Sequence, residues 1–353
     1  MQTINTAPAN AEAHNPPGDH ERGQLPVGSA AAYDDRTAWL MACLSQLAYK
    51  PFDRPDELHK TLASLLIGAD TGLKDQDPKP LLAPDFIGPT PEKSSIKIIE
   101  RYDVNDTQAL LISTHSFLVL VFRGTEANSF TDLKTGANAV ITTCPSGGGI
   151  HSGYNDAYTL VEQRIQADLN SPDNRDKPLI ITGHSLGGAL ATIAAKRLPH
   201  NRDDDGHKAY NGQILACYSF GSPHIGNARW SHGITVPVYR IVNALDYFTQ
   251  LPPGGDVIGS FKFIAGRLPF IGPRLRDYLT RYQGYTHAGF PRHLTDCPPN
   301  HYDNVQLSLE IPLWERSRIW LRSKTLRKSV RDHSIAIYRK KLAIIAARDL
   351  GNS

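Results

Sequence analysis

A short glycine-flanked motif between two apolar stretches constrains the fold of this chain more than any other feature. Residues 183–187 have the sequence Gly-His-Ser-Leu-Gly; the apolar run 178–182 precedes them and an alanine-rich stretch follows. The run predicts a strand buried on both faces of a sheet, and the stretch 185–198 predicts a helix. Glycine has no Cβ atom, so strand and helix can approach closely around a sharp turn. The motif therefore predicts a strand–turn–helix unit.

The rest of the chain continues this alternation. The predicted strands are 109–113, 117–122, 178–182, 213–220 and 238–242, and the predicted helices are 35–49, 154–169 and 185–198. Buried strands alternating with helices predict an α/β fold with a mostly parallel sheet covered on both sides. Residues 51–93 contain many Pro and Asp residues and are expected to be irregular, and residues 126–150 are expected to form a mobile loop.

The chain is expected to form one domain with a tail. Residues 1–29 are rich in Pro, Ala, Asn and Gly, which predicts disorder. Residues 30–350 are expected to be a single domain, since helix-wrapped sheets often reach this length. An insertion at about 259–283 mixes aromatic, aliphatic and basic residues. That composition suits either a lipid surface or a cap packed on the fold, and we expect packing.

The net charge and the N-terminal sequence bear on a nucleic-acid partner and on location. The chain has 38 Lys and Arg residues against 35 Asp and Glu residues, a net charge of +3. This weak field gives no reason to expect a nucleic-acid partner. The N-terminus lacks a basic start and an apolar run, and no stretch reaches the length of a membrane-spanning helix. Cytoplasmic location is therefore the default expectation, with signal-independent secretion left open.

Cysteine spacing and the known cofactor motifs argue against a metal or organic cofactor. Cys43, Cys144, Cys217 and Cys297 form no CxxC pair, so isolated buried thiols are expected, although their number permits a disulfide. The chain has no HExxH motif, P-loop or G-x-G-x-x-G motif. The acidic run 203–205 is interpreted as a solvated turn rather than a calcium site. We therefore expect no cofactor and no metal.

Ser185 is the candidate nucleophile. A serine at a strained strand-to-helix turn is presented at the carboxyl edge of the sheet. The amide of Leu186 then lies at a helix N-terminus, where an oxyanion is favoured. A serine hydroxyl needs a histidine to take its proton and an acid to orient that histidine.

Five ordered stretches resemble the motifs of the class 3 lipases, and together they cover roughly residues 31–345. They are 121–125 (Val-Phe-Arg-Gly-Thr), 150–157 (Ile-His-Ser-Gly-Tyr-Asn-Asp-Ala), 183–191, 219–227 (Ser-Phe-Gly-Ser-Pro-His-Ile-Gly-Asn), and 239–246 with 251–253. The resemblance implies an α/β-hydrolase fold, with a mostly parallel central sheet flanked by helices. It also implies hydrolysis of carboxylic esters, usually of lipids, without a cofactor.

The acid is predicted to be Asp246. In this fold the chain order is serine, acid, histidine. Asp246 follows the predicted strand 238–242 closely and matches the acid's position in the resembling family. Asp256 and Asp277 are weaker candidates, because neither closely follows a predicted strand.

The base is predicted to be His333. Residues 332–338 resemble a D-H-S-x-x-x-Y segment of many bacterial members, which identifies the chain as resembling a bacterial-type member. His301 stays open, because it resembles the histidine that ends fungal members. His287 also stays open, although its family segment usually has a structural role. His293 also follows Asp246 in the chain.

The resemblance also suggests the surroundings of the nucleophile. The amides of Thr125 and Leu186 are expected to hold the oxyanion, and Arg123 and His151 are expected to be structural supports. Family members carry a lid, which corresponds here to residues 126–150, with a phenylalanine where many members have a tryptophan.

The predicted function is hydrolysis of lipid carboxylic esters, in acylglycerols or glycerophospholipids, through an acyl-enzyme. Three alternatives stay open: an esterase for short soluble esters, a secreted phospholipase-type toxin, and a non-catalytic hydrolase-fold binding protein. The expected partners are a lipid or ester substrate and, transiently, a lipid surface. The sequence leaves the acyl-chain length, the head group and the oligomeric state undetermined.

Overall fold

The computed structural model describes residues 32–66, 96–114, 116–124, 141–144, 147–200, 210–244, 246–252, 284–309 and 326–351. Several predictions lie outside this part of the chain: the tail 1–29, the insertion 259–283, Thr125, most of the lid 126–150, the run 203–205, Asp256 and Asp277.

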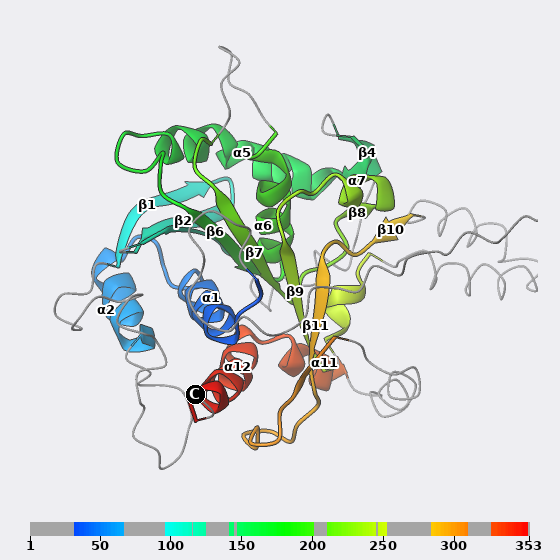
Figure 1. The fold of residues 1–353 in the computed structure, drawn as a ribbon. Coiled ribbons are helices and arrows are strands. Elements are labelled where there is room, and N and C mark those ends of the chain that lie inside the picture. The colour runs from blue at the N-terminus through cyan, green and yellow to red at the C-terminus, as the bar shows by residue number, and fades with distance from the viewer. Residues whose placement is uncertain are drawn as a thin grey trace, which may run out of the picture.

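A mostly parallel sheet forms the centre of the described structure (Figure 1). Its eight described strands have the order β1-β2-β3-β6-β7-β9-β11-β12. They are β1 (Lys97–Val104), β2 (Thr107–Ser113), β3 (Leu118–Phe122), β6 (Leu179–His184), β7 (Ile214–Phe220), β9 (Val238–Asn243), β11 (Phe290–Leu294) and β12 (Leu307–Ser308). Neighbours from β3 to β11 pair in parallel, whereas β2 and β12 pair antiparallel with their neighbours. The predicted mostly parallel sheet is confirmed.

The central strands are buried on both faces, which explains why their sequences are mostly apolar rather than alternating. In β3, Leu118, Leu120 and Phe122 enter one hydrophobic core, while Val119 and Val121 enter a second core. Successive side chains of a strand point to opposite faces of the sheet, so the two cores lie on opposite sides.

Helices cover both faces (Figure 1). Helix α1 (Asp35–Leu47) packs against α12 (Ile335–Gly351) on one side, and α5 (Ser152–Leu169) packs against α6 (Leu186–Arg197) on the other. Helix α1 begins after Asp34, whose carboxylate accepts a hydrogen bond from the Thr37 amide at 2.7 Å. Such N-caps satisfy an amide that has no partner within the helix.

Smaller elements surround this framework. A second sheet has the described order β10-β8-β5-β4. The remaining elements are α2 (Pro55–Leu66), β4 (Ile141–Thr143), β5 (Gly149–His151), β8 (Gly226–Asn227), α7 (Ala228–His232), the 3-10 helix η3 (Tyr247–Gln250), β10 (Tyr285–Thr286) and α11 (Leu326–Asp332).

The structure corrects two predictions of irregular backbone. Helix α2 lies within 51–93, with Pro55 at its first position, where a missing amide costs no hydrogen bond. Its buried Leu58 and Leu62 have helical spacing, a signal hidden among the Pro and Asp residues. Strand β4 lies within 126–150 and β5 begins there, and β5 is fully buried. These strands are too short to show a period in the sequence.

In the described structure none of the four cysteines forms a disulfide. Cys43, Cys144 and Cys217 are buried, and Cys297 is partly exposed. Burial raises the pKa of Cys43 and of Cys217 to about 12, so both stay protonated and unreactive at neutral pH. Within the described ranges, no helix is both long and apolar enough to cross a membrane.

We expect Leu342→Ala to lower the free energy of unfolding by about 2–5 kcal/mol, because it removes a fully buried side chain from the core between the sheet, α1 and α12. Urea unfolding followed by circular dichroism measures this change. Leu160→Ala is the matched control, since Leu160 lies on α5 and is 43% exposed. Equal midpoints for the two variants would contradict this account of α12.

Candidate active site

Ser185 occupies a sharp turn between β6 and α6. Its backbone angles are φ 58° and ψ −127°, a combination that residues other than glycine rarely adopt. The Ser185 amide donates to the Phe220 carbonyl on β7 at 2.9 Å, which holds the strained residue against the sheet. A Cβ atom on Gly187 would lie 2.3 Å from the Phe122 carbonyl oxygen, so the close approach of α6 to β3 requires glycine there. The predicted strand–turn–helix unit is present.

His333 lies beside Ser185, although 148 positions separate them in the chain. It stands in the break between α11 and α12, and its Nε2 is 2.9 Å from the Ser185 Oγ. Its Nδ1 lies 2.8 Å and 2.9 Å from the two carboxylate oxygens of Asp246. All three side chains are buried. We call Ser185, His333 and Asp246 the triad.

The pairing fixes the proton positions of the triad. A carboxylate only accepts hydrogen bonds, so the Nδ1 of His333 carries a proton and donates it to Asp246. In the neutral imidazole Nε2 is then the acceptor and faces the hydroxyl of Ser185. This arrangement lets the imidazole remove a proton from the serine and lets Asp246 stabilise the resulting imidazolium.

Asp246 is held by donors from two other elements. It caps η3, where the Phe248 amide donates to its Oδ1 at 3.1 Å. The hydroxyl of Tyr338, on α12, donates to its Oδ2 at 2.5 Å. Burial and the neighbouring Asp246 raise the pKa of Tyr338 well above its usual value, so this hydroxyl stays a donor. A buried carboxylate with several donors avoids most of the cost of desolvation.

Gly221 provides the space in which the triad meets. It follows β7 with φ +58°, and a Cβ atom there would lie 2.8 Å from the Asp246 Oδ2 and 3.2 Å from the His333 Nδ1. The Phe248 ring also packs against His333, with ring centroids 4.5 Å apart. The imidazole thus contacts an aromatic ring and lies close to the backbone of Gly221.

The structure describes one of the two predicted oxyanion donors, Leu186. Leu186 is the first residue of α6, so its amide is in the first helical turn, where amides lack helical partners. Thr125 itself lies outside the described residues. Its neighbour Gly124 borders the nucleophile, since a Cβ atom there would be 3.1 Å from the Ser185 Cβ.

Arg123 and His151, which were expected to be structural supports, contact neighbouring side chains. The Arg123 guanidinium donates to the Gln108 side chain at 2.6 Å. The His151 ring stacks on Tyr154 at 3.8 Å, and burial lowers its pKa to about 4. A neutral, stacked imidazole fits a role in packing.

The other histidines that follow Asp246 lie in different surroundings from His333. The His287 ring stacks on His224 with centroids 3.8 Å apart. His293 lies in β11, opposite Val242 of β9. His301 is exposed, between β11 and β12. The hydrogen bond to Ser185 therefore favours His333 as the base over these alternatives.

Sequence reasoning missed three residues around the triad: His184, Asn243 and Tyr338. Tyr338 carried a signal, because it is the tyrosine of the segment 332–338 that resembles D-H-S-x-x-x-Y. His184 and Asn243 are the last residues of β6 and β9, and their partners become visible only in three dimensions.

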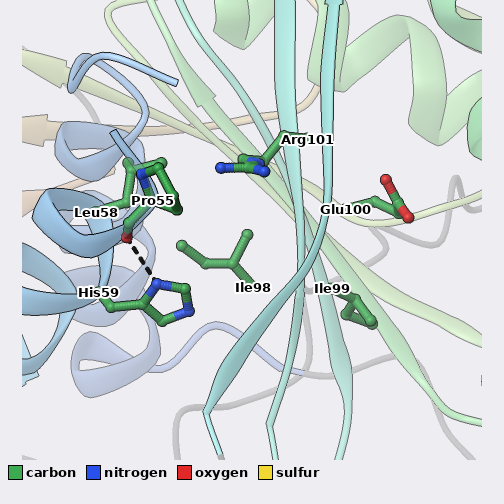
Figure 2. Close-up of a pocket in the computed structure, with 7 residues that line it drawn as sticks. All are labelled: Pro55, Leu58, His59, Ile98, Ile99, Glu100 and Arg101. Atoms are coloured by element: carbon green, nitrogen blue, oxygen red, sulfur yellow. Dashed lines mark hydrogen bonds between the residues drawn. The ribbon is translucent and has the colours of Figure 1, made fainter. Parts of the chain in front are cut away.

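A pocket of about 270 Å³ lies apart from the triad, between α2 and β1 (Figure 2). Its lining is Pro55, Leu58, His59, Ile98, Ile99, Glu100 and Arg101. The His59 ring hydrogen-bonds the Pro55 carbonyl across one turn of α2, as Figure 2 shows. None of the triad residues reaches this pocket.

The described residues also contain no group of three or more His, Cys, Asp or Glu side chains suited to a metal ion.

Comparison with known proteins supports the predicted resemblance. Residues 119–255 match the family model described as "Lipase (class 3)". A secreted mono- and diacylglycerol lipase of Fusarium solani is 34% identical over 113 residues, 31% of this chain and 31% of that protein. A lipase of Rhizomucor miehei is 29% identical over 171 residues, 45% of each chain. The chain thus spans less than half the length of these curated relatives.

The fold matches solved lipase structures over most of the chain. The lipase from Rhizopus microsporus var. chinensis superposes with a TM-score of 0.52 at 19% identity, covering 90% of this chain and 94% of that one. Such low identity shows the fold alone. The chain has the α/β-hydrolase fold, as the motifs predicted.

We expect Tyr338→Phe to slow the reaction of Ser185 with a fluorophosphonate about 10- to 100-fold. The variant removes a hydrogen bond to a charged group, which contributes about 1.5–3 kcal/mol. Intact-protein mass spectrometry measures the rate. Tyr158→Phe is the control, because within the described structure the buried Tyr158 hydroxyl has no hydrogen-bond partner. Equal rates for Tyr338→Phe and the wild type would contradict the proposed support of Asp246.

Proposed function

We propose that this protein is a serine hydrolase that cleaves carboxylic esters of lipids through an acyl-enzyme. The observation that carries the proposal is the buried hydrogen-bonded array from Ser185 through His333 to Asp246. A serine in a strained turn, an imidazole that can accept its proton and a carboxylate that orients the imidazole are the parts that acyl transfer needs.

The first half of the reaction forms the acyl-enzyme. The His333 Nε2 takes the Ser185 proton as the serine oxygen attacks the ester carbonyl carbon. Asp246 stabilises the imidazolium through the Nδ1 hydrogen bond. The imidazolium then donates its proton to the leaving alcohol as the ester bond breaks, which leaves the acyl group on Ser185.

The developing oxyanion needs donors at the turn. The Leu186 amide, at the N-terminus of α6, is one proposed donor, and the Thr125 amide is the second. Each such donor typically contributes about 3–4 kcal/mol to the transition state. In the second half, His333 removes a proton from a water molecule as the water oxygen attacks the acyl carbon. The imidazolium then returns the proton to the Ser185 oxygen as the bond between that oxygen and the acyl group breaks, which releases the carboxylic acid.

The relatives support a lipid ester as the substrate. One is named a mono- and diacylglycerol lipase and another a lipase. We therefore propose acylglycerols or glycerophospholipids as substrates, and a lipid surface as the place where the protein meets them. The bacterial-type assignment rests on the segment 332–338 alone, and these fungal relatives do not support it.

A non-catalytic role is the alternative that the geometry disfavours, because His333 lies within hydrogen-bond distance of Ser185. An esterase for short soluble esters and a secreted phospholipase-type toxin would share the same triad. These two alternatives differ from the proposal in substrate and destination, so substrate profiles separate them better than the site does. The cytoplasmic location remains a prediction from the sequence.

We expect the protein to hydrolyse p-nitrophenyl esters, and we expect Ser185→Ala, His333→Ala and Asp246→Asn each to lower kcat about 10⁴-fold or more. Acyl chains of two to sixteen carbons, tested with and without lipid emulsions, measure the chain-length profile. A preference for long chains would support a lipid substrate, and a preference for two to four carbons would favour the soluble esterase.

His301→Ala is the matched control for the base, because His301 is exposed and was the alternative candidate. It should retain wild-type activity. Loss of activity in His301→Ala with full activity in His333→Ala would overturn the assigned base. A wild-type protein that neither hydrolyses any ester nor reacts with a fluorophosphonate would contradict the proposed function.

A further inference from the structure

The backbone that carries His333 is a break between two helices. Helix α11 ends at Asp332 and α12 begins at Ile335. Carbonyl groups at the end of a helix have no amide partner within that helix, so other groups must satisfy them when they are buried. At this break, two side chains hydrogen-bond to backbone carbonyls. The His184 Nε2 lies 2.6 Å from the His333 carbonyl oxygen, and the Asn243 Nδ2 lies 2.7 Å from the Asp332 carbonyl oxygen.

The direction of the first bond follows from its partners. A carbonyl oxygen only accepts, so the His184 Nε2 carries the proton and donates it. The other nitrogen, Nδ1, is 2.7 Å from the Tyr49 hydroxyl and accepts from it. Both ring nitrogens of a neutral imidazole are thus satisfied.

The neutrality of His184 matters because its ring centroid is 4.7 Å from that of His333. Burial, together with the neighbouring His333, lowers the pKa of His184 well below its usual value. A second cation here would oppose the positive charge that His333 acquires during the proposed reaction. The site therefore has an imidazole that donates a hydrogen bond without contributing a charge.

The second bond is oriented by a buried lysine. The Lys341 Nζ donates to the Asn243 Oδ1 at 2.6 Å, so the amide nitrogen of Asn243 faces the Asp332 carbonyl. The same ammonium donates to the Thr295 carbonyl at 2.6 Å. Asn243 is fully buried and Lys341 nearly so, which limits alternative arrangements of this amide.

The two donors come from the strands that carry the other two members of the triad. His184 is the last residue of β6 and precedes Ser185, and Asn243 is the last residue of β9, three residues before Asp246. The strand of the nucleophile and the strand of the acid thus each hold one carbonyl of the segment that carries the base.

We propose, on the basis of the proposed function, that His184 and Asn243 are positioning residues that clamp the main chain of His333 from both strand ends. The His333 imidazole has to keep Nε2 at 2.9 Å from Ser185 and Nδ1 within 2.9 Å of both Asp246 oxygens. A displacement of the backbone by about 1 Å would weaken both contacts, and such misplacement typically costs about 10²-fold in rate.

Two substitutions of His184 separate positioning from packing. Glutamine carries its amide one atom further out than asparagine, so H184Q can keep a donor near the position of Nε2, whereas H184N cannot reach the His333 carbonyl. We expect H184N to lower kcat about 30- to 100-fold with KM changed less than about threefold, and H184Q to restore kcat to within about fivefold of wild type. Ester hydrolysis and the rate of fluorophosphonate labelling measure both variants.

N243D tests the other half of the clamp. It keeps an oxygen for Lys341 but replaces the amide donor with an acceptor that faces the Asp332 carbonyl. We expect kcat to fall about 10- to 100-fold at unchanged KM. Urea unfolding shows whether each variant is folded, and N243D decides the test if both His184 variants are unfolded.

Equal kcat values for H184N and H184Q, or a wild-type kcat in folded N243D, would overturn the proposal that His184 and Asn243 position the His333 main chain. These outcomes differ from failure of the proposed function, which would show as a wild-type protein inert toward both esters and fluorophosphonate.

Discussion

The hydrogen bonds between His333 and Asp246 connect the C-terminal helices to the carboxyl edge of the sheet, and the candidate site depends on this connection. Asp246 is buried and, if ionised, would be costly without donors. Among the described residues, its donors are the His333 ring, the Tyr338 hydroxyl and the Phe248 amide. Two of these lie on or next to α12, so the docking of that helix and the geometry of the triad depend on one another.

The sheet makes the turn at Ser185 possible. β6 lies between β3 and β7, with Gly183 opposite Phe122 on one side and Ser219 on the other. A strained residue persists when its surroundings determine its conformation, and buried strands on both sides provide such surroundings. The buried strands on both sides therefore hold Ser185 in a backbone conformation that residues other than glycine rarely adopt.

Much of the framework was predictable from local sequence. The run that became β3 is apolar throughout, and those that became β6 and β7 are mostly apolar, because both faces of the sheet are covered; this signal needs no long-range information. The outer strand β1 was not predicted, because charged and partly exposed residues interrupt its apolar pattern. Helix α2 was missed because its apolar positions lie among Pro and Asp residues.

The sequence also determined which residue types could take part in the site and in what order. The glycines around Ser185 specify the turn, and the position of Asp246 after a buried strand places it at the same sheet edge. The choice among four later histidines required the tertiary structure, because proximity between residues 148 positions apart depends on how α11 and α12 pack. The contacts of His184 and Asn243 with the His333 segment were likewise decided by packing. The local sequence determines the chemical type of each side chain and indicates the strand or helix that carries it. Only the tertiary structure determines which atoms that side chain contacts, because those atoms come from distant parts of the chain.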